Sequence, residues 1–248
     1  MVIVAAAQIP VTNDYSKNLN TILSYIKKAA KKQVDIICFP ETSLVYTHNK
    51  KQLQKIDFPS LLNKIKNACR ENRIHCIFST YVLDKNKIHN RAFLIDDLGK
   101  VIFSYDKINL WLGEKRKRIV QGKKNKIINT KFGKIGIIIC WDIAHQNFVQ
   151  DLAKQGAWVI FCPSYLTDYD REVDSYLQIP YVRAFENSCG IVFVDAFSKK
   201  TLAYSCICTP DKMHAEIRKK EGMILAKLDK KKIEKIRKHY KLIKTSSN

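Results

Sequence analysis

The chain has few acidic residues for its length and no long apolar run. Lysine and arginine number 44 against 23 aspartates and glutamates, so the formal net charge is +21. No stretch approaches the roughly 18 uninterrupted apolar residues that a bilayer-spanning helix needs. The N-terminal MVIVAAAQIPVTND also lacks the basic segment that precedes a secretory apolar core. We therefore expect a cytoplasmic protein without a membrane span.

Cysteine pairs at short spacing are missing as well. The eight cysteines lie mostly inside apolar runs and form no Cys-x-x-Cys pair, so the spacing indicates no disulfide framework and favours reduced thiols. Cys206, Cys208 and His214 lack the second ligand pair that a zinc site needs. We interpret them as strand residues, and we expect no metal site.

The excess of positive charge is concentrated in two stretches. One is the basic run Lys115–Arg118, and the other is the tail from Lys230 to Lys244. No recognised nucleic-acid-binding module or glycine–aromatic signature accompanies the charge, so a lysine-rich solvated surface is the favoured interpretation and nucleic acid is not. The tail carries apolar residues at helical spacing, which predicts an amphipathic helix docked on the body from about residue 230: Ile233, Ile236, Tyr240 and Ile243.

Short apolar runs alternate with segments of helical periodicity along the whole chain. Helical periodicity appears at 19–26, 61–68, 148–154 and 171–187. With no linker or internal repeat, residues 1–248 are expected to form a single α/β domain with a mixed sheet and helices on its outer face. The expected strands are Val2–Ile9, Asp35–Phe39, His75–Val82, Ile88–Ile95, Val101–Tyr105, Ile135–Ile139, Ala157–Phe161, Ile191–Val194, Leu202–Cys208 and Met223–Leu228.

Three of the expected strands end at a reactive side chain. Glu41 stands in IICFPETS, Lys107 in YDKINLW and Cys140 in GIIICWDI. Pro40 ends its strand, and we expect the chain to turn sharply there with Glu41 exposed at the turn. Since functional groups gather where strands end, one cleft can collect all three side chains. The basic loop Leu112–Gln121 lacks apolar periodicity and is predicted to be a mobile segment over that cleft.

These three contexts, together with the opening IVAAAQIP and the closing ILAKLD, resemble the nitrilase superfamily of carbon–nitrogen hydrolases over nearly the whole chain. The resemblance implies a four-layer αββα sandwich, in which two mixed sheets lie between helical layers. It also implies a homodimer or higher homo-oligomer that forms through helices. One departure is Gln146-Asn147, where the family usually has Pro-Glu after the nucleophile segment.

The three residue types are the parts of an activated cysteine nucleophile. A free thiol has a pKa of about 8.5, and a lysine about 4 Å away could lower it by two or three units at most. Either thiolate becomes the main species, or Glu41 takes the proton readily. Cys140 would then attack an amide carbonyl, with Lys107 and the backbone N–H of Trp141 stabilising the oxyanion. Water would release the thioester with the help of Glu41, and no metal or organic cofactor is required.

Several further residues have both a functional and a structural interpretation. The resemblance implies that Glu114 helps place the substrate and holds the lysine; alternatively, it is a solvent-exposed partner of the basic run. Tyr46, Tyr165, Trp111 and Phe197 are predicted pocket-wall aromatics, although aromatics are more often core residues.

Residues near the nucleophile are predicted to be structural. Asp142 is expected to support the turn that carries Cys140, and His145 to begin the next helix. Arg183 and Glu186 match a helix segment of the family and are expected to form a structural ion pair near the cleft.

The predicted function is hydrolysis of a small-molecule ω-amide or N-carbamoyl compound. A nitrilase proper is less favoured because most family branches cleave amides, and acyl transfer to an amine is a further option. The basic run Lys115–Arg118 indicates a carboxylate on the substrate. A different class of function is a catalytically inactive nitrilase-like scaffold that acts as a basic nucleic-acid or protein-binding module.

Overall fold

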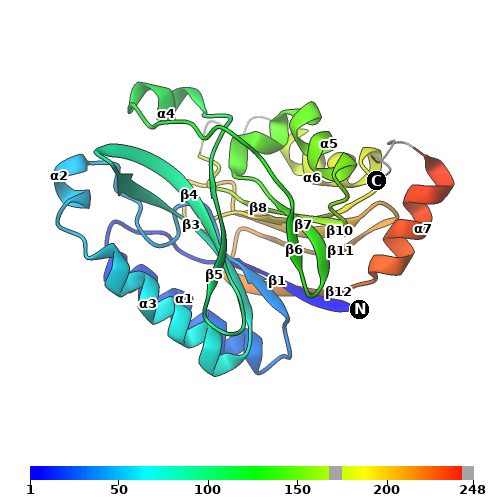
Figure 1. The fold of residues 1–248 in the computed structure, drawn as a ribbon, viewed down its shortest axis with the longest axis horizontal. Coiled ribbons are helices and arrows are strands. Elements are labelled where there is room, and N and C mark those ends of the chain that lie inside the picture. Colours follow the sequence, from blue (N-terminus) through cyan, green and yellow to red (C-terminus); the bar gives the residue numbers. More distant parts are fainter. Residues whose placement is uncertain (168–174, 242–248) are drawn as a thin grey trace.

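The computed structural model describes residues 1–167 and 175–241, whose strands form two six-stranded sheets packed face to face (Figure 1). The first sheet has the order β12-β1-β2-β3-β4-β5. Its three central strands, β1 to β3, are parallel, and their neighbours are antiparallel. The bounds are β1 Val2–Gln8, β2 Ile36–Cys38, β3 His75–Asp84, β4 Lys87–Ile95, β5 Val101–Asp106 and β12 Gly222–Leu228.

The second sheet repeats this plan with the order β11-β10-β9-β8-β7-β6. Here β7, β8 and β9 are parallel, and the strands outside them are antiparallel. The bounds are β6 Ile128–Thr130, β7 Gly133–Ile137, β8 Val159–Pro163, β9 Gly190–Val194, β10 Tyr204–Thr209 and β11 Lys212–Arg218.

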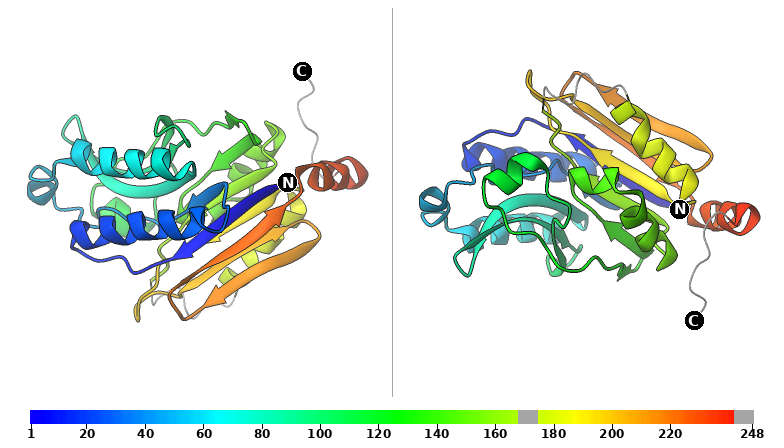
Figure 2. Two further views of the ribbon diagram at one scale, coloured as in Figure 1. Left: turned by 90° about the horizontal axis from the view of Figure 1, so that it is seen from below. Right: turned by 90° about the horizontal axis from the view of Figure 1, so that it is seen from above.

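Helices cover the outer faces of both sheets (Figures 1 and 2). The first sheet is covered by α1 (Tyr15–Ala30) and α3 (Phe58–Asn72), and the second by α5 (Gln146–Lys154) and α6 (Ser175–Glu186). The remaining helices are α2 Lys50–Leu53, α4 Leu112–Arg116, the 3₁₀ turn η1 Cys140–Ala144 and α7 Lys230–Tyr240.

Strand β1 shows why the sandwich has four layers. Val4 and Ala6 belong to the apolar cluster shared with the second sheet, whereas Ala5 and Ala7 belong to the cluster under α1 and α3. A strand buried on both faces carries no polar alternation. The expected αββα sandwich of two mixed sheets is thereby confirmed.

The prediction differs from the structure in the short and exposed elements. The segment predicted as a mobile loop, Leu112–Gln121, begins with helix α4, and strands β6 and β11 were not expected. The helix expected over Arg171–Asn187 is α6 in its described part, with Pro180 inside it; residues 171–174 lie outside the described residues. Within residues 1–167 and 175–241, no helix is both long and apolar enough to cross a membrane.

The predicted amphipathic tail helix is α7, and it docks through fewer residues than expected. Ile233 is buried in the core and Ile236 is half-buried, but Tyr240 is 55% exposed, so that part of the prediction is wrong. Arg237 completes the docking by donating to the carbonyls of Ala157 (2.6 Å) and Ser188 (3.0 Å). Ile243 lies outside the described residues.

Candidate active site

Glu41 lies on a turn that joins the two sheets. Its backbone N–H donates to the carbonyl of Ser164 at the end of β8 (3.1 Å), and the N–H of Thr42 donates to Ser79 Oγ on β3 (2.9 Å). Thr42 has a φ of +52°, which allows the sharp change of direction after Pro40. Glu41 was expected to be exposed, but it is only 5% exposed, because the second sheet covers the turn.

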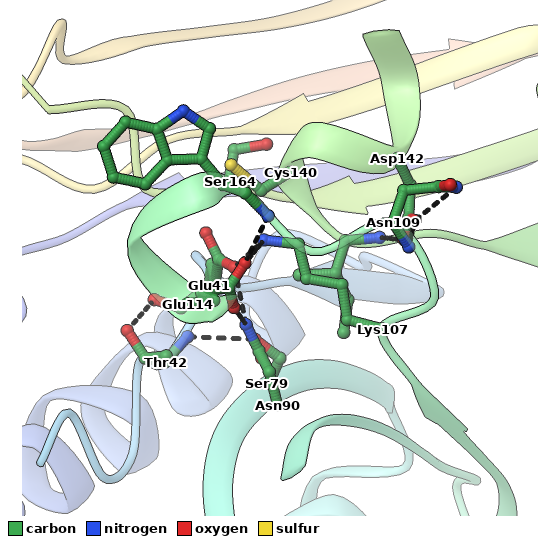
Figure 3. A network of polar contacts seen from close by, with 12 residues as sticks. Glu41, Thr42, Ser79, Asn90, Lys107, Asn109, Glu114, Cys140, Asp142 and Ser164 are labelled. Atoms are coloured by element: carbon green, nitrogen blue, oxygen red, sulfur yellow. Dashed lines mark hydrogen bonds and ion pairs between the residues drawn. The ribbon is translucent and has the colours of Figure 1, made fainter. Parts of the chain in front are cut away.

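Lys107 follows β5, and its side chain extends towards Glu41 (Figure 3). Its Nζ lies 2.8 Å from Glu41 Oε1 and 2.6 Å from Glu114 Oε2. Its backbone N–H donates to the carbonyl of Asn90 on β4 (2.9 Å), which fixes the start of the side chain. The side chain is 2% exposed, so its charge is compensated almost entirely by these two carboxylates.

Glu114 is positioned by the single turn of α4. Its Oε2 also accepts from the backbone N–H of Trp111 (3.1 Å), so the carboxylate closes the first turn of its own helix. A Cβ on Gly113 would lie 2.3 Å from the ring of Trp111, so a larger residue there would have to displace that ring. The implied contact with the lysine is present, and the solvent-exposed alternative is wrong because Glu114 is 7% exposed.

Cys140 follows β7 and begins the 3₁₀ turn η1. It has a φ of +47°, a left-handed conformation that is uncommon for residues other than glycine and that often marks functional sites. Trp141 follows it in the same turn. The backbone N–H of Tyr165, beyond the end of β8, forms a hydrogen bond with Cys140.

Asp142 supports this turn, as predicted. Its carboxylate is fully buried and accepts from the N–H of Ile139 (2.9 Å), the N–H of Asn109 (2.8 Å) and the hydroxyl of Tyr105 (2.8 Å). The turn that carries Cys140 is thereby tied to the segment that carries Lys107.

The charges around Cys140 determine its protonation. Burial and the nearby Glu41 raise the pKa of the thiol well above its usual range, although Lys107 acts in the opposite direction. Burial also raises the pKa of Glu41, against the effect of Lys107. Burial alone would lower the pKa of Lys107, but Glu41, Cys140 and Glu114 outweigh it and keep the ammonium protonated. These directions favour a neutral thiol at Cys140 over a standing thiolate.

Asn90 belongs to the site and was not predicted. Its Nδ2 donates to Glu41 Oε1 (2.6 Å) and to Glu114 Oε1 (2.9 Å), and the residue is fully buried on β4. One signal was present: an asparagine in the middle of a predicted strand is unfavourable unless its side chain has a particular role.

A cavity of about 90 Å³ is lined by Glu41, Lys107, Glu114 and Cys140. Four of the predicted residues line it: Tyr46, Tyr165, Trp111 and Trp141. The rings of Tyr46 and Tyr165 pack 5.1 Å apart. Phe197 borders a different hollow, so its prediction as a wall of this pocket is wrong. Further lining residues are Thr42, His48, Tyr81, Gly113, Lys117, Leu166 and Thr167.

The remaining predictions concern structural residues. His145 is exposed and immediately precedes α5, and Arg183 pairs with Glu186 (2.9 Å). Arg183 also donates to the carbonyl of Ile143 (2.9 Å), so the predicted ion pair stabilises η1.

The residues considered as zinc ligands lie on two adjacent strands. Cys206 and Cys208 are buried residues of β10. His214 on β11 lies 2.8 Å from Thr209 Oγ1. The interpretation as strand residues is confirmed. In the part of the chain that the structure describes, no group of three potential ligands could hold a metal ion.

Comparisons with known proteins agree with this architecture. The family described as carbon–nitrogen hydrolase matches residues 3–238. The probable hydrolase nit2 of Schizosaccharomyces pombe is 24% identical over 269 residues, covering 98% of this chain and 97% of the relative. The omega-amidase NIT3 of Saccharomyces cerevisiae is 24% identical over 256 residues, covering 93% and 88%. The N-carbamoylputrescine amidase of Solanum lycopersicum is 28% identical over 178 residues, covering 66% and 58%.

A solved structure shares the fold. The carbon–nitrogen hydrolase from Helicobacter pylori G27 has a TM-score of 0.88 at 17% identity, with 97% of this chain and 94% of that chain covered.

Proposed function

Since the chain belongs to the carbon–nitrogen hydrolase family of the nitrilase superfamily, we propose that it is a cysteine-dependent amidase of small molecules. The observation that carries the proposal is the buried cluster of Glu41, Lys107 and Glu114 in the same cavity as the Cys140 thiol. In this proposal Cys140 is the nucleophile, Glu41 is its base and Lys107 is the electrostatic stabiliser.

The burial of this cluster supports an active enzyme over a catalytically inactive nitrilase-like scaffold. Removing charged groups from water costs several kcal/mol per ion, and apolar residues of similar size are often as stabilising. Lys107 and its two carboxylates are each less than 10% exposed. A protein that only bound a partner through its surface would gain nothing from this arrangement.

In the proposed first step, Cys140 attacks the carbonyl carbon of the amide while Glu41 takes the thiol proton. Glu41 is a suitable base because burial raises its pKa above the usual range of a carboxyl group, which makes the carboxylate more basic. The developing oxyanion would be stabilised by Lys107 Nζ, which keeps its proton, and by the backbone N–H of Trp141. Glu41 then returns the proton to the leaving nitrogen, and ammonia or an amine departs from a thioester.

In the second step, Glu41 takes a proton from water, and the hydroxide equivalent attacks the thioester carbonyl. The carbon–sulfur bond breaks, the acid is released and the thiol regains its proton. Glu114 does not face the reacting sulfur in this scheme; it holds Lys107 against Glu41.

We propose a carboxylate-bearing ω-amide or N-carbamoyl compound as the substrate. Relatives described as an omega-amidase and an N-carbamoylputrescine amidase support the reaction class. The small cavity suits a short acyl group. Lys117 lines the cavity, is exposed and has no ion pair among residues 1–167 and 175–241, so its ammonium is available to a substrate carboxylate.

The test is a panel of short amides and N-carbamoyl compounds assayed for release of ammonia, with mass spectrometry of the intact protein for a trapped acyl adduct. We expect turnover by the wild type and an adduct on the Cys140 peptide. Cys140→Ala should remove both while the circular dichroism spectrum is unchanged. Cys162→Ala is the matched control, since it removes a neighbouring buried cysteine and should leave turnover measurable.

Two outcomes would contradict the proposal. One is normal turnover by Cys140→Ala. The other is no turnover of any compound together with nucleic-acid binding that weakens steeply with salt, which would favour the basic binding module.

A further inference from the structure

The side chain of Asn90 contacts both carboxylates of the site at once. Each hydrogen of its NH₂ group goes to a different glutamate, Glu41 at 2.6 Å and Glu114 at 2.9 Å. We propose that Asn90 is a positioning residue that keeps Glu41 ionised and aimed at Cys140. The inference rests on the proposed function, in which Glu41 is the base.

The orientation of this amide is fixed by the charges around it. Turning it over would place Oδ1 against two carboxylate oxygens, which is repulsive, so only the NH₂ group can face them. Figure 3 shows Asn90 below Glu41 and Lys107, on the side of the cluster away from Cys140. The hydrogen bond from Asn90 therefore reaches Glu41 on the side away from Cys140, and the side of Glu41 that faces Cys140 stays free.

The two hydrogen bonds to the glutamates leave the other end of the amide without a partner. Its Oδ1 is buried and has no hydrogen-bond partner among the described residues. A buried unpaired acceptor is unfavourable, so the two carboxylates and not Oδ1 set the orientation of the amide.

The backbone of Asn90 adds a third contact that a side-chain substitution leaves in place. Its carbonyl accepts the backbone N–H of Lys107 (2.9 Å). Truncating the side chain should therefore leave Lys107 in position and change only the donors to Glu41 and Glu114.

The effect on pH dependence follows from the groups that face Glu41. Lys107 after β5 favours its charged form, whereas Glu114 on α4 disfavours it. Cys140 on η1 contacts it directly, and Tyr81 on β3 and Cys162 on β8 lie within its field. Asn90 is the neutral donor of the set. Removing a donor to a carboxylate raises the carboxylate's pKa, so the base would ionise only at higher pH.

The experiment compares Asn90→Ala and Asn90→Asp with the wild type by two pH profiles. One is kcat/KM for amide hydrolysis. The other is the rate at which iodoacetamide alkylates Cys140, followed by mass spectrometry of its peptide, which needs no substrate. We expect the acid limb of both profiles to move up by about one pH unit in Asn90→Ala. At the low-pH end, kcat/KM should fall roughly tenfold or more.

The isosteric Asn90→Asp keeps the volume and adds a third carboxylate, so its shift should be at least as large. The matched control is Asn187→Ala. Asn187 is also fully buried, its Nδ2 also donates to a glutamate (Glu186, 3.2 Å), and its Oδ1 also has no partner among the described residues. Its profiles should keep the wild-type acid limb.

Unshifted profiles in both folded Asn90 variants would overturn the inference, even if activity falls, because that would indicate a purely structural role. The test distinguishes failure of the proposed function from failure of this inference. If the wild type hydrolyses no amide but the alkylation profile shifts, the positioning role stands and the assignment of the reaction is wrong.

Discussion

Two lysines line the same cavity, and they differ in whether carboxylates of the protein compensate their charge. Lys107 is 2% exposed and lies within 2.8 Å of two carboxylates, so its charge is already compensated inside the protein. Lys117, which is exposed directly after α4, has no such partner among residues 1–167 and 175–241. Because Lys117 is exposed, an ion pair with a ligand would contribute little binding free energy. No carboxylate of the described residues competes with the ligand for the Lys117 ammonium.

This contrast gives a prediction for Lys117→Ala. With a carboxylate-bearing amide, kcat/KM should fall roughly two- to tenfold, the range of an exposed ion pair. The methyl ester of the same amide should be hydrolysed as before. The measurement is steady-state ammonia release with both compounds at two salt concentrations, since salt should weaken the wild-type preference. Lys115→Ala is the control, because Lys115 is exposed on α4, two residues before Lys117, but does not line the cavity. Equal losses on acid and ester would contradict carboxylate recognition by Lys117.

At the same scale, the sequence predicts the chemical groups better than their partners. Glu41, Lys107 and Cys140 could be placed because each follows an apolar run that reads as a strand. The bridge through Asn90 could not be placed, because it depends on the register of β4 against β5, where the Lys107 amide meets the Asn90 carbonyl. Register is a tertiary property that strand patterns do not specify.

At the scale of elements, the missed pieces are those with little apolar burial. In α4 the buried residue is Glu114, so a search for apolar periodicity cannot detect the helix. Strand β11 buries only Ile217 and lies at the edge of its sheet, which weakens the alternation of its pattern. The long central elements were predictable because their apolar faces decide their structure.

The turn η1, which carries Cys140, is the element whose stability can be tested most directly. Asp142→Asn keeps the shape, but either orientation of the amide places NH₂ against a backbone N–H, from Ile139 or from Asn109. One buried donor stays unpaired, and we expect a loss of about 1–3 kcal/mol in the free energy of unfolding. The measurement is urea unfolding at an unchanged m-value.

Turnover should fall along with stability in Asp142→Asn, because Cys140 sits on the same turn. The control is Asp151→Asn on the exposed face of α5, which should change stability by less than about 0.5 kcal/mol. Wild-type stability in Asp142→Asn would show that the turn does not depend on this carboxylate.

At the scale of the molecule, the site exists only because the sheets stack. Glu41 and Lys107 come from the ends of β2 and β5 in the first sheet, and Cys140 comes from the end of β7 in the second. The hydrogen bond from the Glu41 amide to the Ser164 carbonyl is one place where the two sheets are joined directly. The order of strands and helices predicts a mixed sheet, but the second sheet followed only from the resemblance to the family, because strand order in space is not written in local patterns.

The whole molecule also presents an apolar patch that bears on its assembly. On α6, Val182 is 48% exposed and Phe185 is 49% exposed, one helical turn apart. The ring of Tyr240 on α7 lies 6.3 Å from that of Phe185. Neighbouring exposed apolar side chains on adjacent helices are typical of an interface.

We expect the protein to be a homodimer that forms through this helical face, and Phe185→Asp to be a monomer by sedimentation velocity at physiological ionic strength. The formal net charge of +21 means that two copies repel each other. An added aspartate lowers that repulsion, so dissociation of the variant would report the loss of apolar contact. Leu98→Asp is the control, because it places the same charge on an equally exposed leucine (54%) in the hairpin between β4 and β5 and should remain dimeric. A wild type that sediments as a monomer at micromolar concentration would contradict the dimer, and a dimeric Phe185→Asp would move the interface to another face.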